Sequence, residues 1–424
     1  MGVRQSTITA PVWSEPARDT HSLSLKLKVV TPLFGGGYQA REIDDLNVIR
    51  PAAIRGQLRY WWRATAGAKF KTAEEMYEAE WRIWGSATET KKKEDDPPKG
   101  GPSKVGVRVK LTDQGSKRKL SEVVPRSTPR EGPREGYFTF PFQEQRGDNP
   151  APEAYCRIGV QFELSLCMDA ELDEQTQQQI ENAVKAWIAF GGVGARTRRG
   201  CGALQVTEDN SKTWLPPPDA SAREKWFKSL VSPGDTLENL PTLTGGRIVL
   251  GGSPQDAKQL WSSLGTFWAR FRKGQVGRIE YSPMSGSKWN DYDNLDAHRR
   301  GSAISLAKPY LGLPIIFQDF KDGKFHGNVE AGESGRMASP IIVKPLALSN
   351  GHFLPMVAVL KAHKIDKVKI KDDLVDLLPP AKEDPVMKEL FAQDVYDKEL
   401  LAQDVYDAVI VAAKGHVGTE VVSL

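Results

Sequence analysis

The sequence predicts an α+β protein of two tandem ferredoxin-like (RRM-like) domains with polar loop insertions. Three observations support this fold class. The chain has 424 residues, which is too long for one ordinary core. In its first half, alternating and helical hydrophobic patterns follow each other in the order β-α-β-β-α-β. In its second half, a strand, a helix and several further strands follow again, which indicates a second, divergent copy of the same fold.

The first domain begins with a strand at residues 22–31, where leucine or valine alternates with serine or lysine. A proline and three glycines between Thr31 and Gly37 then turn the chain. Pro51 suits the first turn of a helix, where its missing N–H costs nothing, so we expect a helix over 52–68. Helical spacing of apolar residues predicts another helix over 73–84.

Alternation returns at residues 105–111, and the longest strand pattern of the chain runs from Tyr155 to Met168. Apolar residues at helical spacing predict a helix over 173–190, which two glycines end. A short strand is expected at 203–206. These segments complete the first β-α-β-β-α-β set.

Two stretches within the first domain, 88–102 and 113–152, are rich in charge, glycine and proline. We expect the first to be an exposed insertion and the second to be an insertion that forms a functional or interaction loop and not packed structure. The triple proline at 216–218 marks a boundary, so the first domain is expected at 1–214 and the second at 215–424.

In the second domain we expect a strand at 247–250 and a helix at 256–271. The apolar runs that follow lie at 313–317, 339–348 and 353–360. Two nearly identical decapeptides come near the end, KELFAQDVYD at 388–397 and KELLAQDVYD at 398–407. Ten residues advance a helix by about 1000°, roughly 80° short of whole turns, so the two copies cannot share one face. We interpret the repeat as a duplication that lengthens an exposed C-terminal helix.

The composition limits the class of protein. The net charge is only +4, so any case for nucleic-acid binding depends on where the arginines cluster. Cys156, Cys167 and Cys201 lack the spacing of a zinc site or a disulfide framework, which fits a reducing cytoplasm. The polar N-terminus is unlike a signal peptide, and no stretch approaches about eighteen apolar residues. We therefore expect a cytoplasmic protein without cofactor, metal or membrane contact.

The stretch from Ile49 to Arg63 is the most distinctive of the chain. In a helix it has an apolar face that consists of Ile54, Leu58, Trp61 and Thr65. Its other face consists of Arg55, Arg59, Trp62 and Arg63, and Arg50 precedes it. Guanidinium groups beside an indole suit phosphates and an unstacked base better than they suit a core, so we predict that this face is a binding surface for such groups. The alternative is an amphipathic helix whose arginines face water.

The stretch from Gly191 to Leu204 combines glycine with arginine. Close approach of a ligand to the backbone is possible at its glycines, which are Gly191, Gly192, Gly194, Gly200 and Gly202. Arg196, Arg198 and Arg199 add positive charge, and the stretch contains no acidic residue. It has neither the Gly-Lys-Ser/Thr of a triphosphate-binding loop nor the position of a dinucleotide-binding turn. We predict a phosphate-binding loop, and the alternative is an ordinary glycine-rich turn.

These stretches resemble the RAMP superfamily of CRISPR proteins. The resemblance is carried by TPLFGG at 31–36, by IRP at 49–51 and by IRGQLRYWWR at 54–63. The stretch 191–204 is similar to the glycine-rich loop that marks the superfamily, and MASPIIVKPL at 337–346 is similar to a segment of the second domain. The helix motif is most like that of the first RAMP subunit of the type III-B (Cmr) effector complex. The two insertions and the decapeptide repeat depart from the family pattern.

The resemblance implies a tandem of ferredoxin-like folds in a multisubunit RNA-guided complex. It implies a non-catalytic subunit near the 3′ end of the guide RNA that helps to capture target RNA in antiviral defence. The implied partners are the guide RNA, the target RNA and other RAMP subunits. In the family the helix arginines and the glycine-rich loop face RNA, so these roles carry over to Arg55, Arg59, Arg63, Arg196, Arg198 and Arg199. Trp62 is added from its helical phase alone.

Two other functions stay open. Some relatives in the superfamily cut guide-RNA precursors without metal, which requires a histidine, tyrosine or lysine beside the scissile ribose. His21 is the candidate, although a histidine just before the first strand is more often idle. Asp44 and Asp45 would suit a divalent ion, yet acid pairs in loops are usually just solvated. A scaffold that contacts only protein would use the same fold without RNA.

Overall fold

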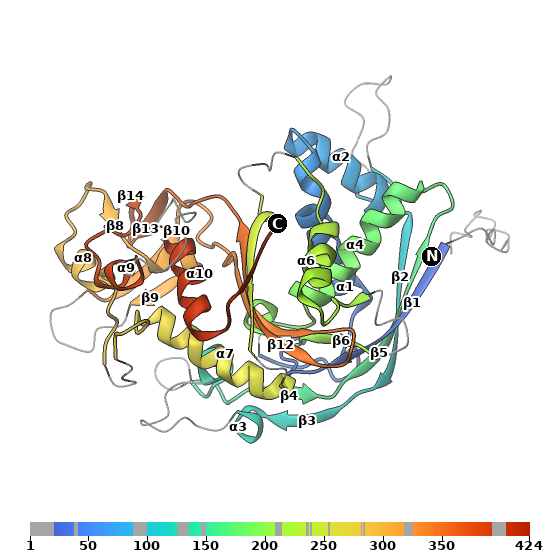
Figure 1. The fold of residues 1–424 in the computed structure, drawn as a ribbon, viewed down its shortest axis with the longest axis horizontal. Coiled ribbons are helices and arrows are strands. Elements are labelled where there is room, and N and C mark those ends of the chain that lie inside the picture. Colours follow the sequence, from blue (N-terminus) through green and yellow to red (C-terminus); the bar gives the residue numbers. More distant parts are fainter. Residues whose placement is uncertain are drawn as a thin grey trace, which may run out of the picture.

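The computed structural model describes residues 21–37, 41–87, 100–124, 135–145, 150–207, 214–234, 237, 240–252, 255–280, 282, 285–317, 325–391 and 404–424. It confirms the α+β class (Figure 1). In these ranges, no helix has the length and apolar character needed to cross a bilayer. Most of the first predicted insertion, 88–102, lies outside the described residues.

The first sheet has its strands in the order β2-β5-β1-β6, and all neighbours are antiparallel. The elements of this first unit are β1 (His21–Val29), α1 (Pro51–Ala66), α2 (Ala73–Trp84), β2 (Val105–Asp113), β5 (Gln161–Met168), α4 (Glu174–Phe190) and β6 (Leu204–Val206). Apart from α2, they follow the β-α-β-β-α-β order that the hydrophobic patterns predicted.

A second sheet repeats this arrangement with the order β11-β12-β7-β15, again antiparallel. The elements of the second unit are β7 (Thr242–Leu250), α7 (Ala257–Arg272), β11 (Ile341–Ala347), β12 (Phe353–Lys361), α10 (Val405–His416) and β15 (Glu420–Ser423). They correspond one to one with those of the first unit apart from α2, which is compatible with the predicted tandem of ferredoxin-like domains. The domain boundary between 214 and 215 stays a prediction.

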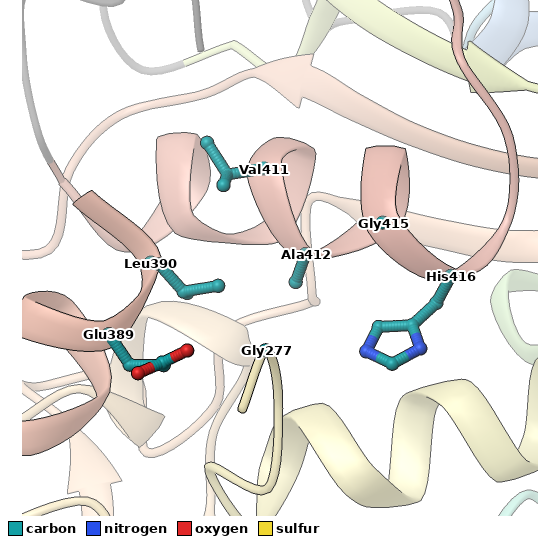
Figure 2. A pocket seen from close by; sticks show the side chains of 7 residues that line it. All are labelled: Gly277, Glu389, Leu390, Val411, Ala412, Gly415 and His416. Carbon is teal, nitrogen blue, oxygen red and sulfur yellow. The ribbon is translucent and has the colours of Figure 1, made fainter. Parts of the chain in front are cut away.

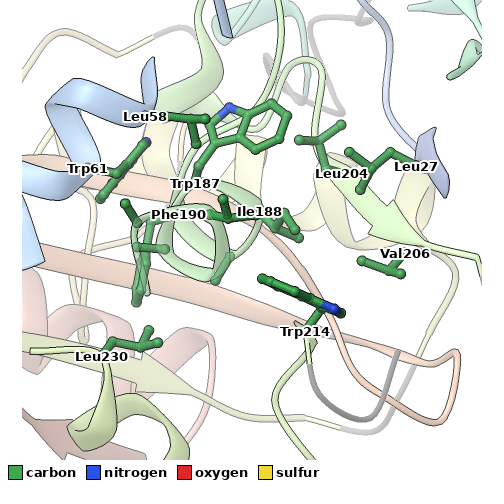
Figure 3. Close-up of a cluster of buried hydrophobic side chains, with 14 of the residues drawn as sticks. Leu27, Leu58, Trp61, Trp187, Ile188, Phe190, Leu204, Val206, Trp214 and Leu230 are labelled. Carbon is green, nitrogen blue, oxygen red and sulfur yellow. The ribbon is translucent and has the colours of Figure 1, made fainter. Parts of the chain in front are cut away.

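The two units share a hydrophobic core, because helices α1 and α4 pack against both sheets. Figure 3 shows Trp61 and Phe190 from these helices in one cluster with Leu204 of the first sheet. On the second sheet, Ile248 belongs to this cluster, whereas its neighbour Val249 belongs to the cluster around α7 and α10. Since both faces of the second sheet are covered, β11 and β12 are apolar at nearly every position and do not alternate.

Insertions enlarge both units. In the first, a two-stranded ribbon and short helices are formed by β3 (Ser116–Lys119), α3 (Leu120–Val123), η2 (Glu135–Tyr137), η3 (Phe140–Phe142) and β4 (Tyr155–Ile158). In the second, a five-stranded sheet at one end of the molecule has the order β8-β14-β13-β10-β9 (Figure 1). Its strands are β8 (Ile304–Ser305), β9 (Ile315–Phe317), β10 (Gly327–Ala331), β13 (Lys367–Ile370) and β14 (Asp373–Leu378). The remaining helices are η1 (Gly67–Lys69), η4 (Thr197–Arg199), α6 (Ala220–Ser229), α8 (Asp291–Ala297), η5 (Lys308–Leu311) and α9 (Pro385–Phe391).

Two predicted elements are wrong. The single strand expected at 155–168 is two strands, because Gly159 takes the left-handed conformation (φ 77°) and turns the chain. As a result β4 pairs with β3, while β5 enters the first sheet. The long C-terminal helix is also wrong, since α9 and α10 are separate helices and the strand β15 follows them.

The two decapeptide copies contribute different halves to the fold. In the first copy, residues 388–391 complete α9, and Leu390 is buried. In the second copy, Asp404 caps α10 and Val405 is buried. The interpretation as an exposed helix is therefore wrong for these residues, and the intervening residues 392–403 lie outside the described ranges.

Candidate nucleic-acid interface

Helix α1 is more deeply packed than its sequence suggested. Arg50 lies exposed at its N-cap, and Pro51 occupies the first turn, as predicted. Trp62 is completely buried, and its Nε1 donates to Gln179 Oε1 of α4 at 3.3 Å. The prediction that Trp62 stacks on an RNA base is therefore wrong. The prediction failed because α1 contacts α4, α2 and the second sheet, so that little of the helix surface faces solvent.

The three arginines of α1 contact helix α2. Arg59 Nε lies 2.7 Å from Glu80 Oε1 and Arg63 Nε lies 3.8 Å from Glu80 Oε2, while the Glu80 side chain is only 2% exposed. Arg55 donates to the carbonyl of Trp84 at the end of α2. The arginine face is thus neither a set of freely solvated charges nor an open phosphate site, since it holds α2 in place. The side chains of Arg59 and Arg63 keep 29% and 37% of their surface exposed, and their contact with RNA stays a prediction.

The glycines of the loop at 191–204 are required mainly by contacts within the protein. A Cβ on Gly202 would lie 1.9 Å from the carbonyl oxygen of Val193, and one on Gly200 would lie 2.9 Å from Trp261 Cδ1 of α7. Gly191 and Gly192 are buried, while Gly194 is exposed. We predicted that a ligand can approach the backbone closely at all five glycines. That prediction is therefore wrong for the four buried glycines. The accessible part of the loop is the segment 194–198.

Arg199 lies inside the protein, with 8% of its surface exposed. Its Nη1 donates to the carbonyl of Ile341 at 2.6 Å, its Nη2 donates to Ser339 Oγ at 2.9 Å, and its guanidinium lies over the ring of Trp268. Burial and the neighbouring arginines hold the pKa of Arg199 well below its usual value. The prediction that Arg199 binds RNA directly is wrong, because its guanidinium joins the loop to the second unit.

Tyr60 connects α1 with the loop. Arg198 Nη2 donates to the Tyr60 hydroxyl at 3.0 Å, and Arg198 also donates to the carbonyl of Ser339. Burial raises the pKa of Tyr60, and the nearby charges of Arg198 and then Arg63 act in the opposite direction. The structure therefore brings Arg63 and Arg198 together around one tyrosine. The motif contains Tyr60, but helical phase gave no reason to single it out.

Lys344 of β11 fixes the base of the loop. It is 1% exposed, and its Nζ donates to the carbonyls of Ile188 at 3.0 Å and Gly191 at 2.8 Å. Burial lowers the pKa of Lys344 to about 7. The segment 337–346, which the sequence related to the same family, thus lies directly behind the glycine-rich loop. The stretches 54–63, 191–204 and 337–346 therefore meet at this joint between the two units.

The acid pair Asp44 and Asp45, considered above as ligands of a divalent ion, forms hydrogen bonds and ion pairs within the protein. Asp44 accepts hydrogen bonds from the backbone N–H groups of Leu46 and Asn47, and Asp45 binds Lys117 at 2.6 Å and Arg157 at 2.7 Å. Hydrogen bonding from Lys117, followed by that from Arg157, lowers the pKa of Asp45 against the effect of its burial. The acid pair therefore belongs to local structure. In the described part of the chain, no cluster of three or more His, Cys, Asp or Glu residues has the geometry of a metal site.

A pocket lies away from this joint, between α9, α10 and the turn at Gly277 (Figure 2). Glu389 and His416 are its charged or titratable lining residues. Glu389 Oε1 accepts from the backbone N–H of Arg278 at 2.6 Å, and burial lowers the pKa of His416. The pocket includes none of the residues predicted to bind RNA.

Comparison with known proteins agrees with the motifs. Residues 26–205 match the family model described as the RAMP superfamily. The resemblance inferred from the sequence is thereby confirmed.

Particular relatives are similar to this chain. The CRISPR system Cmr subunit Cmr1-2 of Pyrococcus furiosus is 29% identical over 191 residues, which are 42% of this chain and 92% of that protein. The apo crystal structure of Cmr1 from Pyrococcus furiosus has a TM-score of 0.48 at 16% identity, with 84% of this chain and 94% of the other covered. A chain of the cryo-EM structure of the type III-B Cmr-beta bound to cognate target RNA has a TM-score of 0.42 at 14% identity, with 83% and 97% covered.

Proposed function

We propose that this chain is a non-catalytic RNA-binding subunit of a type III-B CRISPR effector complex. It lies near the 3′ end of the guide RNA, helps to capture target RNA in antiviral defence, and assembles with other RAMP subunits in the cytoplasm. The RAMP-superfamily region and the similarity to a relative named as a Cmr subunit support this assignment.

The observation that carries the proposal is the joint around Tyr60. There the partly exposed Arg63 of α1 and Arg198 of the loop both lie near one aromatic residue. The charges that act most strongly on the neighbouring Arg199 come from Arg196, Arg272 and Arg198, which are all positive. A concentration of guanidinium groups of this kind is suited to the phosphates of an RNA backbone.

Binding is tested with the double variant Arg63→Gln/Arg198→Gln and a single-stranded RNA of guide sequence. If both side chains contact phosphates, affinity falls and the slope of log K against log salt becomes shallower by about 1.4, since each contact on a single strand contributes about 0.7. The matched control is Arg278→Gln/Arg300→Gln, which removes two exposed arginines paired with Glu389 and Asp373. Equal slopes for the two double variants would contradict the proposed interface, and a wild-type protein that binds no RNA would favour a scaffold that contacts only protein.

The non-catalytic part of the proposal has its own test. His21 is exposed at the first residue of β1. Incubation of the purified protein with guide-precursor and target RNAs, without metal, is expected to leave both RNAs intact. Cleavage that His21→Ala abolishes would establish the endoribonuclease alternative.

A further inference from the structure

The second insertion of the first unit has a role that the family pattern does not supply. Its described residues include η2 (Glu135–Tyr137), which packs against α7 of the second unit. Tyr137 is partly buried against the core around α7, and Phe138 is fully buried. The insertion therefore reaches from the first unit to the second unit, beside the glycine-rich loop.

The insertion contacts one arginine from each unit. Arg196 of the loop donates from Nε to the carbonyl of Phe138, and Arg272 at the end of α7 donates from Nε to the Tyr137 hydroxyl at 3.2 Å. Both side chains are partly exposed. Each of these two bonds uses Nε and neither uses a terminal nitrogen of the guanidinium. Terminal guanidinium nitrogens are the ones that grip a phosphate in pairs.

The charged groups around Arg196 and Arg272 include a third arginine, Arg199. Arg272 lowers the pKa of Arg196, and after burial both Arg196 and Arg272 lower the pKa of Arg199. Tyr137 and Cys201 act in the opposite direction. Positive charges held close together favour an anion between them.

The backbone of Arg196 gives an independent indication. Arg196 has φ 58° and ψ 35°, a left-handed conformation that is unfavourable for a residue with a Cβ. Glycine occupies this conformation without that cost, and the loop uses glycine at several other positions. An arginine kept at a strained position points to a use of its side chain.

We propose that Arg196 and Arg272, oriented by Phe138 and Tyr137, form a second phosphate site that carries single-stranded RNA from the glycine-rich loop onto the second unit. This inference rests on the proposed function and extends it. The site takes residues from both units and from the insertion. The RNA path would then cross the joint between the units.

The test compares Arg272→Gln with the wild-type protein in RNA binding at several salt concentrations. Loss of one phosphate contact is expected to lower affinity several-fold at low salt and to make the slope of log K against log salt shallower by about 0.7. Arg278→Gln is the matched control, because Arg278 follows α7 closely, is exposed and pairs with Glu389. Tyr137→Phe keeps all charges, so it is expected to weaken binding less and to leave the slope unchanged.

Arg196→Gly separates binding from folding. It relieves the left-handed strain, so the melting temperature is expected to stay within a few degrees of the wild type while RNA affinity falls as in Arg272→Gln. If the wild type binds RNA and Arg272→Gln leaves the slope unchanged, the second phosphate site is wrong while the proposed function stands. If the wild type binds no RNA at any salt concentration, the proposed function itself fails.

Discussion

At the scale of single residues, Trp62 illustrates what helical phase decides and what it does not. Phase correctly placed Trp62 beside Arg55 and Arg59, yet burial depends on the elements that pack around the helix. Helix α4, more than a hundred residues later in the chain, covers Trp62 and supplies Gln179 as a partner. A contact of that kind leaves no local pattern in the sequence.

Replacing Trp62 by alanine is expected to lower the free energy of unfolding by about 3–5 kcal/mol, because a large buried side chain is lost and a cavity remains. Trp62→Phe should cost less. Chemical denaturation measures both values, and RNA affinity per folded molecule should stay unchanged. A variant that keeps its stability but loses RNA affinity would restore the stacking role.

Lys344 provides a second prediction at this scale. Its pKa is about 7 in the folded protein against 10.5 for an ordinary lysine, so between these values the unfolded chain binds more protons. Stability therefore rises as pH increases from about 7 to 10, with a slope of up to about 1.4 kcal/mol per pH unit from this group, and the penalty is full below pH 7. Denaturation from pH 7 to 9 should show this slope in the wild type and lose it in Lys344→Met. Equal slopes would contradict the burial of a titrating lysine.

At the scale of elements, the family-like stretches could be found in the sequence, but the contacts between them could not be predicted. The strand and helix of each family-like motif could be predicted because alternation and helical spacing are local properties. The contact of Arg198 and Arg199 with Ser339 could not be predicted in this way, because it joins residues about 140 positions apart in the chain. The five-stranded sheet was missed because its strands are as short as two or three residues.

The contact between α1 and α2 gives a prediction about stability. Glu80→Gln removes the buried carboxylate that holds Arg59 and Arg63, so the free energy of unfolding should fall by about 1–3 kcal/mol. Glu78→Gln is the control on the same helix, because Glu78 is half exposed and should change stability by less than about 0.5 kcal/mol. Similar values for the two variants would contradict a structural role of the arginine face.

At the scale of the whole molecule, the shared core makes the two units interdependent. Helices α1 and α4 present apolar side chains to the second sheet, and Lys344 and Arg199 join the units through buried hydrogen bonds. We therefore expect one cooperative unfolding transition, with tryptophan fluorescence and far-ultraviolet circular dichroism giving the same midpoint. Two separated transitions would show that the units are independent domains.

The central claim is that RNA lies on the joint where α1, the glycine-rich loop and the segment 337–346 meet. Ultraviolet cross-linking of a bound guide-like RNA, followed by mass spectrometry of the linked peptides, tests it most directly. The account predicts cross-links in the peptides that contain Tyr60 and residues 194–198. Efficient cross-links confined to peptides remote from this joint, such as those of the five-stranded sheet, would contradict it.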